Sequence, residues 1–339
     1  MKCGVAGASG YLGAELLRLL ADHPKFDVVT AQADSTAGAR LGDEYPALAR
    51  AYPDLVLDHL DVGALADLDT VFVALPSGQS QDVVASLAGR VGLVVDLGAD
   101  FRLKDPAAYP QWYGFEHTQP ALLAEAVYGL PELYRESLAG ARLISSPGCY
   151  VTAASLALEP LVGAGLVETS GIVVDAASGT SGAGKVPGAN FHHPLANERF
   201  APYGLLTHRH TPEIEQVIGA QVIFTPHLAP MTRGILTTCY ARPTAGTNPS
   251  TGSLLDFLAA RYAGDPFVHV TAGLPSTADA YGSNVAHLTA RYDERTGWVL
   301  VLAAIDNLVK GGSGQAVQAA NVALRIPETT GLPLVGLSP

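Results

Sequence analysis

A cysteine behind a Pro-Gly corner is the residue of this chain best suited to nucleophilic chemistry. Pro147 and Gly148 let the backbone turn sharply before Cys149, and the helix-like run 153–159 follows it. A helix N-terminus offers unpaired N–H groups, which favour a thiolate. The alternative interpretation of a lone cysteine in an apolar run is a small buried hydrophobe. The rest of the chain must decide between the two.

A second stretch, His208-Arg209-His210, supplies candidate acid/base groups. Thr211 before Pro212 predicts a helix start, with the threonine as N-cap, so His210 is expected just before that helix. A histidine beside an arginine, in a chain that already offers a thiol, is a candidate acid/base, although a single histidine is more often structural. Four histidines lie between residues 192 and 210, but their spacing is irregular and no cysteine ligands match them, so no metal is expected.

The chain begins with the order strand, glycine turn, helix. Residues 2–6 resemble a short buried strand, Gly7, Gly10 and Gly13 form a GxxGxxG turn, and residues 14–21 form an amphipathic helix. Without side chains, the turn lets backbone N–H groups and the positive helix end approach a pyrophosphate. This order predicts a dinucleotide-binding fold.

The end of the second predicted strand, 26–33, gives conflicting signals about the cofactor. Asp34 suits a ribose 2′-hydroxyl and therefore NAD, whereas Ser35, Thr36 and Arg40 could hold the 2′-phosphate of NADP. A plain polar turn is the other interpretation. The residues alone leave the choice open.

Three more strands, 70–75, 91–97 and 141–145, alternate with helical runs and end in turns rich in glycine or proline. This alternation predicts a parallel, doubly wound sheet with its ligand at the carboxyl ends of the strands. Arg102 and Cys149 then lie at the ligand edge, although a surface salt bridge is the other interpretation of Arg102. The stretch from 105 to 134 has little periodicity and is expected to be a long packed connection.

The second half of the chain predicts a different kind of sheet. A strand at 172–177 runs into a glycine-rich loop, 178–185, which lacks the full P-loop spacing and is expected to face the cofactor rather than a nucleoside triphosphate. Strand-like runs follow at 222–225, 235–241, 268–272, 284–291 and 298–304, and indicate a mostly antiparallel sheet. Pro160 is expected to stop the helix after Cys149, and an amphipathic helix at 314–324 is expected to pack back on the first domain.

Length and charge limit the classes of function. A chain of 339 residues can form two domains, and its formal charge of −12 disfavours nucleic acid and anionic membranes as general partners. Three cysteines without CxxC spacing indicate a reducing compartment. No segment offers the ~18 uninterrupted apolar residues of a membrane helix, so a cytoplasmic protein is expected.

Seven motifs, taken in order, resemble the N-acetyl-γ-glutamyl-phosphate reductase family of the aspartate-semialdehyde dehydrogenase-like superfamily over nearly the full length. They are GASGYLG at 7–13, GADFRLKD at 98–105, YGLPELY at 128–134, SSPGCYVTA at 145–153, SGTSGAGK at 178–185, HRHTPEIEQ at 208–216 and AAIDNLVKG at 303–311. Any one could arise by chance, but seven in this order should not.

The resemblance implies an α/β protein with two domains. A Rossmann-type, doubly wound parallel sheet over 1–148, completed by the C-terminal helix 309–331, would bind NADP(H). An α+β domain over 149–308, with a mostly antiparallel sheet, would carry catalysis, substrate binding and dimerisation, giving a homodimer or homotetramer. The implied reaction is NADPH-dependent reduction of N-acetyl-L-glutamyl 5-phosphate to the 5-semialdehyde and phosphate in arginine biosynthesis.

The family motifs also imply roles for individual residues. Cys149 would be the nucleophile, His210 the acid/base with His208 as the fallback, and Glu213 the residue that orients His210. Arg102 would grip the substrate phosphate, while Arg209, Arg233 and His208 would contact the rest of the substrate. The cofactor would be lined by Gly7, Ser9, Gly10, Tyr11, Leu12, Ser35, Arg40, Pro76, Ser77, Gly78, Gly182, Gly184 and Asn307.

Two other functions are compatible with the sequence. The segment Phe191–Pro194 is similar to that of the related reductases that act on a carrier-bound aminoadipyl or glutamyl phosphate in lysine and arginine synthesis. An acidic carrier protein would need a basic surface around the active site, and a net charge of −12 gives no sign of one. The other alternative is a non-catalytic NADP-binding redox sensor in which Cys149 is only oxidised.

Overall fold

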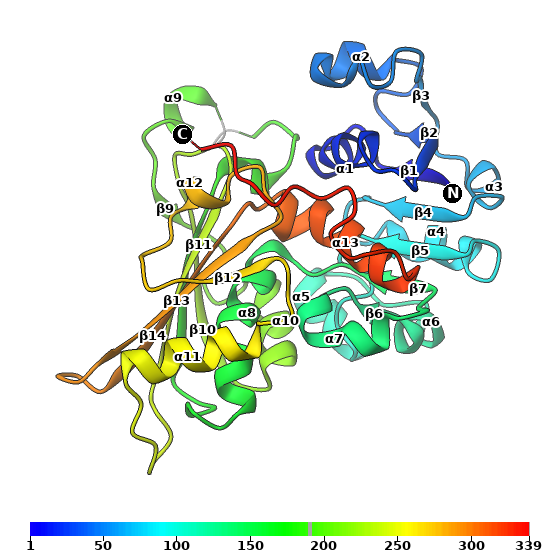
Figure 1. Ribbon diagram of the computed structural model, residues 1–339. Coiled ribbons are helices and arrows are strands. Elements are labelled where there is room, and N and C mark those ends of the chain that lie inside the picture. Colours follow the sequence, from blue (N-terminus) through cyan, green and yellow to red (C-terminus); the bar gives the residue numbers. More distant parts are fainter. Residues whose placement is uncertain (189–191, 339) are drawn as a thin grey trace. The chain divides into compact units, whose positions relative to one another are not determined.

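The computed structural model describes residues 1–188 and 192–338, so Phe191 of the segment compared with the carrier-linked reductases lies outside the described residues. The chain forms two compact units (Figure 1). One unit comprises Met1–Pro147 and Gly312–Leu332, and the other comprises Gly148–Gly311 and the residues from Pro333 onward. Each unit has its own sheet.

The first unit is built on a seven-stranded sheet in the order β3-β2-β1-β4-β5-β7-β6. Every neighbouring pair is parallel, which confirms the predicted doubly wound sheet. The strands are β1 Lys2–Ala6, β2 Asp27–Gln32, β3 Leu57–Asp58, β4 Thr70–Val73, β5 Leu93–Asp96, β6 Val127–Tyr128 and β7 Leu143–Ser145. Because the strands are parallel, the turns that follow them gather along one edge of the sheet.

Short helices connect these strands, and the C-terminal helix returns to the same unit. The helices are α1 Tyr11–Ala21, α2 Leu41–Glu44, α3 Val62–Leu65, α4 Ser80–Leu87, α5 Tyr109–Tyr113, α6 Pro120–Glu125, α7 Pro131–Leu138 and α13 Gly314–Ala323. Helix α13 contacts α1, α7 and β5, as predicted for a helix that packs back on the first domain. The connection 105–134, expected to lack regular structure, holds three of these helices in part or whole and strand β6.

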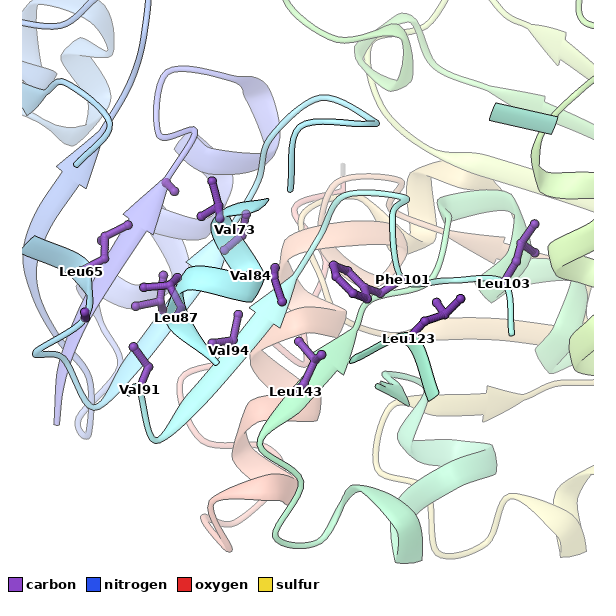
Figure 2. Close-up of a cluster of buried hydrophobic side chains, with 14 of the residues drawn as sticks. Leu65, Val73, Val84, Leu87, Val91, Val94, Phe101, Leu103, Leu123 and Leu143 are labelled. Carbon is purple, nitrogen blue, oxygen red and sulfur yellow. The ribbon is translucent and has the colours of Figure 1, made fainter. Parts of the chain in front are cut away.

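The core of the first unit follows from burial of its central strands on both faces. Strands β4 and β5 are buried at every position, as expected for parallel strands with helices on both sides. Figure 2 shows Val73 and Val94 among side chains from α4 and from the loop after β5, including Leu87 and Phe101. This packing fixes the loop that carries Arg102.

The second unit contains a mixed sheet in the order β12-β13-β14-β11-β8-β10-β9. Two neighbouring pairs, β8–β10 and β12–β13, are parallel, and the others are antiparallel, so the sheet is mostly antiparallel as predicted. The strands are β8 Ile172–Ser178, β9 Ala201–Pro202, β10 Val222–Leu228, β11 Ile235–Ala241, β12 Val268–Val270, β13 Ala286–Asp293 and β14 Trp298–Ile305.

Helices complete the second unit. They are α8 Cys149–Gly163, α9 His193–Ala196, α10 His210–Ile218, α11 Thr251–Arg261 and α12 Thr277–Ala280, and a π-helical turn follows at Val309–Ser313. Helix α8 contacts β11 and β14, and α11 contacts β13. Helix α11 was not predicted, although Ser250 and Ser253 form a capping box at its start.

The prediction that Pro160 stops the helix after Cys149 is wrong. Helix α8 continues through Pro160 to Gly163. Proline has no N–H to donate to the carbonyl four residues earlier, which would leave the Leu156 oxygen without its helical partner. The Tyr262 hydroxyl donates to that oxygen at 2.7 Å, so a distant side chain replaces the missing bond.

Candidate active site

Cys149 is the first residue of α8, which begins four residues earlier than the predicted run 153–159. Gly148 is the N-cap, with φ −67° and ψ 148°, and its extended backbone turns the chain into the helix. Cys149 is partly exposed, in contrast to the buried Cys3 and Cys239. A thiol at the start of a helix and open to solvent has the setting that favours a reactive thiolate.

The His210 imidazole lies directly against Gly148. A Cβ atom built on Gly148 would stand 2.4 Å from His210 Nε2 and 2.7 Å from Cε1. Only glycine allows this approach, so Gly148, which directly precedes Cys149, is the residue that lets the His210 ring pack here. His210 is itself buried and is the first residue of α10, which begins two residues earlier than the predicted start at Pro212. The structure therefore brings Cys149 and His210 to the same place.

Glu213 also acts on the loop that carries the cysteine. It lies in the first turn of α10, is fully buried, and its Oε1 accepts a hydrogen bond of 2.9 Å from the Gly148 N–H. This bond runs to the backbone before Cys149, and the role of Glu213 in orienting His210 stays a prediction. A charged acceptor gives a stronger bond than a neutral one, so Glu213 ties the start of α10 to the start of α8.

His208 is held in a neutral form beside His210. Burial, and then the charge of Arg209, lowers the pKa of His208 to about 4. Its Nδ1 accepts the His210 N–H at 3.1 Å, and the two rings meet edge to face with centroids 4.7 Å apart. A histidine that is neutral at physiological pH cannot stabilise a thiolate as imidazolium, which favours His210 as the acid/base.

An aromatic pair that the sequence analysis did not single out surrounds these histidines. The Tyr150 ring packs edge to face on His208 and His210, at 5.8 and 5.9 Å between centroids. The Tyr203 hydroxyl donates to the Tyr150 hydroxyl at 3.2 Å, and Tyr150 donates to the His227 carbonyl at 3.0 Å. Burial raises the pKa of both phenols, that of Tyr203 to about 12, so both remain protonated. Tyr150 directly follows Cys149 in the chain, and this adjacency could have identified it as a site residue from the sequence.

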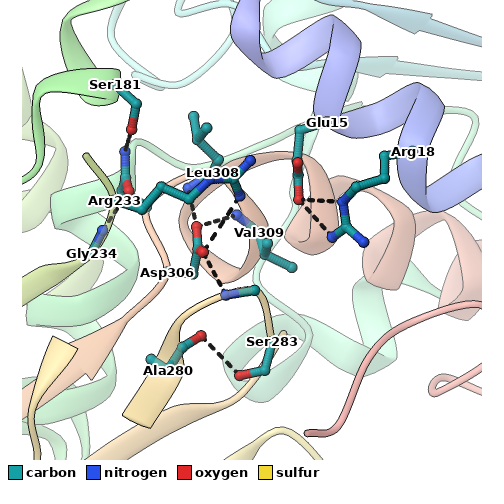
Figure 3. A network of polar contacts seen from close by, with 12 residues as sticks. Glu15, Arg18, Ser181, Arg233, Gly234, Ala280, Ser283, Asp306, Leu308 and Val309 are labelled. Carbon is teal, nitrogen blue, oxygen red and sulfur yellow. Dashed lines mark hydrogen bonds and ion pairs between the residues drawn. The ribbon is translucent and has the colours of Figure 1, made fainter. Parts of the chain in front are cut away.

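Asp306 and Asn307, after β14, organise a polar network in the second unit (Figure 3). Asn307 Oδ1 accepts the Gly234 N–H at 2.7 Å, and its Nδ2 donates to Ser181 Oγ at 2.9 Å. Asp306 Oδ2 accepts the Gly282 N–H at 2.8 Å and lies 3.5 Å from the Arg233 guanidinium. Figure 3 also draws the Glu15–Arg18 ion pair of α1, which belongs to the first unit.

The structure describes five further predicted site residues of the second unit. Asn307, predicted to line the cofactor, is buried and holds the glycine-rich loop through Ser181. Gly182 lies in the 3₁₀ turn Thr180–Ala183, where a Cβ would stand 2.8 Å from Ser178 Oγ, and Gly184 follows with φ +85°. Arg233 is paired with Asp306, while Arg209 is exposed as the N-cap of α10.

Gly311 is a further glycine that the site requires and that we did not predict as a site residue. A Cβ built on it would stand 2.9 Å from the Cys149 Cβ and 3.3 Å from the Cys149 Cα. It lies within the π-helical turn Val309–Ser313, a geometry that is frequent at functional sites. The motif AAIDNLVKG contains this residue and was the signal that could have identified it.

In the first unit, the predicted glycine turn has the shape of a pyrophosphate cradle. Gly7 has φ +84°, and a Cβ on Gly13 would stand 2.3 Å from the Gly7 carbonyl oxygen. Gly10 is the N-cap of α1 and supplies no side-chain cap, while the nearest atom to its virtual Cβ is 3.7 Å away. The start of α1 is therefore open to an anionic group, which fits a dinucleotide.

Side-chain hydroxyl groups from outside the glycine turn hold its backbone in place. The Ser9 carbonyl accepts the Tyr45 hydroxyl at 2.7 Å, and the Leu12 carbonyl accepts the Ser313 hydroxyl at 2.7 Å. Tyr11 begins α1 and its side chain is exposed. These bonds use carbonyl oxygens, whereas the Gly7 and Ala8 N–H groups donate to the Gln32 carbonyl at 2.8 and 2.9 Å and the Gly10 N–H donates to the Gly7 carbonyl at 3.3 Å.

Ser35 and Arg40 lie in the exposed segment after β2, next to Asp34. Arg40 is the N-cap of α2. Both a carboxylate and a guanidinium are thus available at the end of β2. The choice between NAD and NADP stays a prediction.

Pro76, Ser77 and Gly78 form the turn after β4, and this turn lies against the glycine turn of β1. A Cβ on Gly7 would stand 2.3 Å from the Ala74 carbonyl oxygen. The two turns therefore form one surface at the carboxyl ends of β1 and β4, where a doubly wound fold binds its ligand.

Arg102 is fixed at the ends of two further strands. Its Nε donates to the Ser146 carbonyl at 2.8 Å, just after β7, and its NH2 group donates to the Leu97 carbonyl at 3.0 Å, just after β5. The side chain is 9% exposed. Two carbonyl acceptors orient the guanidinium fork, an arrangement suited to a phosphate or carboxylate.

Among residues 1–188 and 192–338, no cluster of three or more histidine, cysteine or acidic side chains has the arrangement of a metal site. Within the same ranges, no helix is long and apolar enough to cross a membrane.

Two family models together match most of the chain and define its class. The model "Semialdehyde dehydrogenase, NAD binding domain" matches residues 2–141, and "Semialdehyde dehydrogenase, dimerisation domain" matches residues 149–307. The fold class agrees with solved structures. The chain resembles aspartate semialdehyde dehydrogenase II from Vibrio cholerae, with a TM-score of 0.70 at 17% identity over 96% of this chain and 98% of that one. The enzyme from Candida albicans with NADP gives 0.69 at 17% identity, over 95% and 97%.

Curated relatives narrow the class further. N-acetyl-gamma-glutamyl-phosphate reductase from Symbiobacterium thermophilum is 50% identical, over 98% of this chain and 97% of its own. The reductases of the same name from Desulforudis audaxviator and Heliobacterium modesticaldum are 47% and 44% identical, each over the full length of both chains. This chain belongs to the N-acetyl-γ-glutamyl-phosphate reductase family of the semialdehyde dehydrogenases, as its motifs predicted.

Proposed function

We propose that this chain is an NADPH-dependent reductase that converts N-acetyl-L-glutamyl 5-phosphate into N-acetyl-L-glutamate 5-semialdehyde and phosphate, in arginine biosynthesis. The observation that carries the proposal is the fit of Cys149, at the start of α8, with the His210 imidazole packed against Gly148. Full-length relatives with this reductase name at 43–50% identity support the choice of substrate.

The residue types suit acyl transfer followed by reduction. The Cys149 thiolate attacks the acyl carbonyl, a carbon–sulfur bond forms, and the phosphate leaves with the electron pair of the broken carbon–oxygen bond. NADPH, when bound, supplies the hydride that reduces the resulting thioester. His210 protonates the developing oxyanion and later takes that proton back, so the thiohemiacetal collapses to aldehyde and thiolate.

Glu213 and His208 act around these two groups. Glu213 holds the Gly148 N–H and so fixes the start of α8, on which the cysteine stands. His208 stays neutral and holds the backbone N–H of His210. Both therefore maintain the approach of the thiol and the imidazole, and a 1 Å misplacement of such groups can cost about 10²-fold in rate.

The cofactor and the substrate anion fit groups at the carboxyl edge of the first unit. Gly7, Gly10 and the N-terminus of α1 would hold the pyrophosphate of NADP(H), with Ser35 and Arg40 at the adenosine end. Arg102 would hold the substrate phosphate, because its guanidinium is oriented by two carbonyl acceptors. In the second unit, Arg209 and Arg233 are the candidates for the substrate carboxylate.

The dimerisation domain supports an oligomer, and we infer a homodimer or homotetramer that uses the open face of the second sheet. Along β8 and β11 buried residues alternate with partly exposed ones, which include Val173, Leu236 and Tyr240. Ile223 on β10 is 55% exposed. A sheet face with this much apolar surface is typical of an interface between subunits.

We also infer a cytoplasmic location, because the proposed chemistry needs a reduced thiol. All three cysteines are thiols rather than disulfides. Thiols of this kind persist in a reducing compartment.

The proposal is tested by the reverse reaction of the purified protein. With N-acetylglutamate semialdehyde, NADP and phosphate, the protein should form NADPH, and Cys149→Ala should abolish this while NADPH still binds. Cys239→Ala is the matched control, since Cys239 is a buried thiol of β11 and should leave turnover in place. Undiminished turnover by the Cys149 variant would exclude the mechanism.

The same assay separates the alternatives. Preference for a carrier-bound substrate would assign the chain to the carrier-linked reductases. Cofactor binding without turnover of either substrate would indicate a redox sensor. Comparison of NADP with NAD at equal concentration tests the assignment of Ser35 and Arg40.

A further inference from the structure

Two buried carboxylates stand behind the turn after β4 in the first unit. Asp96 is the last residue of β5, Asp100 follows four residues later, and both have no exposed surface. Neither was predicted to have a role. A buried charge is costly unless hydrogen bonds satisfy it, so the partners of these carboxylates indicate what they do.

Asp100 binds the backbone of the turn that was predicted to face the cofactor. Its Oδ1 accepts the Gly78 N–H at 2.6 Å and its Oδ2 accepts the Ser80 N–H at 2.9 Å. Each oxygen thus has its own backbone donor. Gln79 is the N-cap of α4 and Ser80 its first residue, so the carboxylate also lies at the positive end of that helix.

The turn held in this way needs support, because its backbone is unusual. Gly78 has φ +87°, and a Cβ there would stand 3.2 Å from the Phe115 ring. The start of the same turn packs on the glycine turn, since a Cβ on Gly7 would stand 2.3 Å from the Ala74 oxygen. Asp100 therefore fixes one side of the surface on which the dinucleotide is proposed to lie.

Asp96 supports the same cluster by different contacts. Its Oδ1 accepts the Gly98 N–H at 3.0 Å and its Oδ2 accepts the Ser80 hydroxyl at 3.3 Å. Burial, and then the negative charge of Asp100, raises the pKa of Asp96 to about 7. Asp96 thus binds its own loop and a side chain, whereas Asp100 binds the N–H groups of the turn.

We infer that Asp100 is a positioning residue for NADPH. It accepts the hydrogen bonds of the Gly78 and Ser80 N–H groups from the buried side of the turn, and so holds the turn 76–78 in the shape that contacts the cofactor. The inference rests on the proposed function, in that the cofactor lies on this turn. It follows that these two amides do not bind the cofactor phosphates, which fall to the N-terminus of α1 instead. At the other helix start on this edge, that of α4, the Asp100 carboxylate already accepts the N–H of Ser80.

Amide hydrogen exchange of the wild-type protein tests this without any substitution. The Gly78 and Ser80 amides should exchange slowly in the protein without nucleotide, and added NADPH should not slow them further, whereas amides at the start of α1 should gain protection. Fast exchange at Gly78 and Ser80 that NADPH suppresses would overturn the inference, because the cofactor would then be their acceptor.

Kinetics of Asp100→Asn test the positioning role. An amide can accept from only one of the two N–H groups, so the KM for NADPH should rise about tenfold or more, while kcat at saturating NADPH and the KM for the acyl phosphate stay within about threefold. Asp96→Asn is the matched control, since it changes the same buried cluster without touching those amides, and its KM for NADPH should stay within about twofold.

The outcomes separate this inference from the proposed function. A fall in kcat with unchanged KM for NADPH in Asp100→Asn would refute the positioning role and leave the reductase activity in place. No reductase activity in the wild type would refute the function, while the exchange experiment would still report on the Asp100 contacts. If Asp100→Asn does not fold, exchange in the wild type decides.

Discussion

Substitution of Gly148 by alanine should separate the thiol from its acid/base without removing either. The new Cβ would stand 2.4 Å from His210 Nε2 and 2.7 Å from Cε1, so the imidazole must retreat by about 1 Å to reach an ordinary contact distance of ~3.4 Å. The imidazole is the end of a side chain and can move. The Gly148 backbone, with φ −67° and ψ 148°, also suits alanine.

The expected cost to folding is therefore small and the cost to turnover is large. Alanine is a poorer N-cap than glycine, which should lower the free energy of unfolding by roughly 1 kcal/mol. Displacement of His210 by about 1 Å should lower kcat by about 10²-fold. The Gly148 N–H to Glu213 remains available, so Cys149 should keep its place at the start of α8.

The assay combines steady-state kcat, titration of the accessible thiol and thermal unfolding. Gly148→Ala should retain one accessible thiol, a nearly unchanged Tm and a strongly reduced kcat. Gly252→Ala is the control, because Gly252 lies in α11 and a Cβ there would stand 3.8 Å from Ser250 Oγ, an ordinary contact distance. It should stabilise the protein by about 0.5–1 kcal/mol with unchanged kcat. A kcat within threefold of wild type for folded Gly148→Ala would refute the reasoning.

Three further expectations concern charge, pH and helix α8. His210→Asn should lower kcat by about 10²-fold, whereas His208→Asn, in which the amide oxygen can still accept the next N–H, should stay within about threefold in the same assay. Because burial and a neighbouring carboxylate raise the pKa of Asp96 from 3.8 to about 7, the unfolded chain binds fewer protons than the folded one in that window, and this group's contribution to stability falls as pH rises from about 4 to 7. Denaturant titrations measure the free energy of unfolding across this pH range, and its fall should be smaller in Asp96→Asn than in the wild type, by up to roughly 4 kcal/mol. An equally steep fall in the variant would contradict the role given to Asp96. Tyr262→Phe should cost about 1 kcal/mol in wild type but less in a Pro160→Ala background, where the helix can make its own bond; equal costs in a double-mutant cycle would argue against the proposed replacement.

Much of the fold could be predicted because local patterns and backbone constraints act over short distances. The strands β1 and β11 match their predicted ranges, since buried runs between glycine turns leave few other conformations. Helix α8 shows the limit of such rules: Pro160 ends a helix only when the freed carbonyl has no other donor, and Tyr262 lies 106 residues from Leu156 along the chain.

For the candidate site, too, some features could be predicted from the sequence and others depend on the tertiary structure. The sequence by itself determined which residues have the chemistry, a thiol at a helix start, histidines and glycine turns, because those depend on residue type and close neighbours. Only the tertiary structure decided that Glu213 binds the Gly148 N–H, that His208 is kept neutral and that Asp100 holds the turn after β4. Burial and long-range hydrogen bonds set these roles, and neither can be read from residues adjacent in the chain.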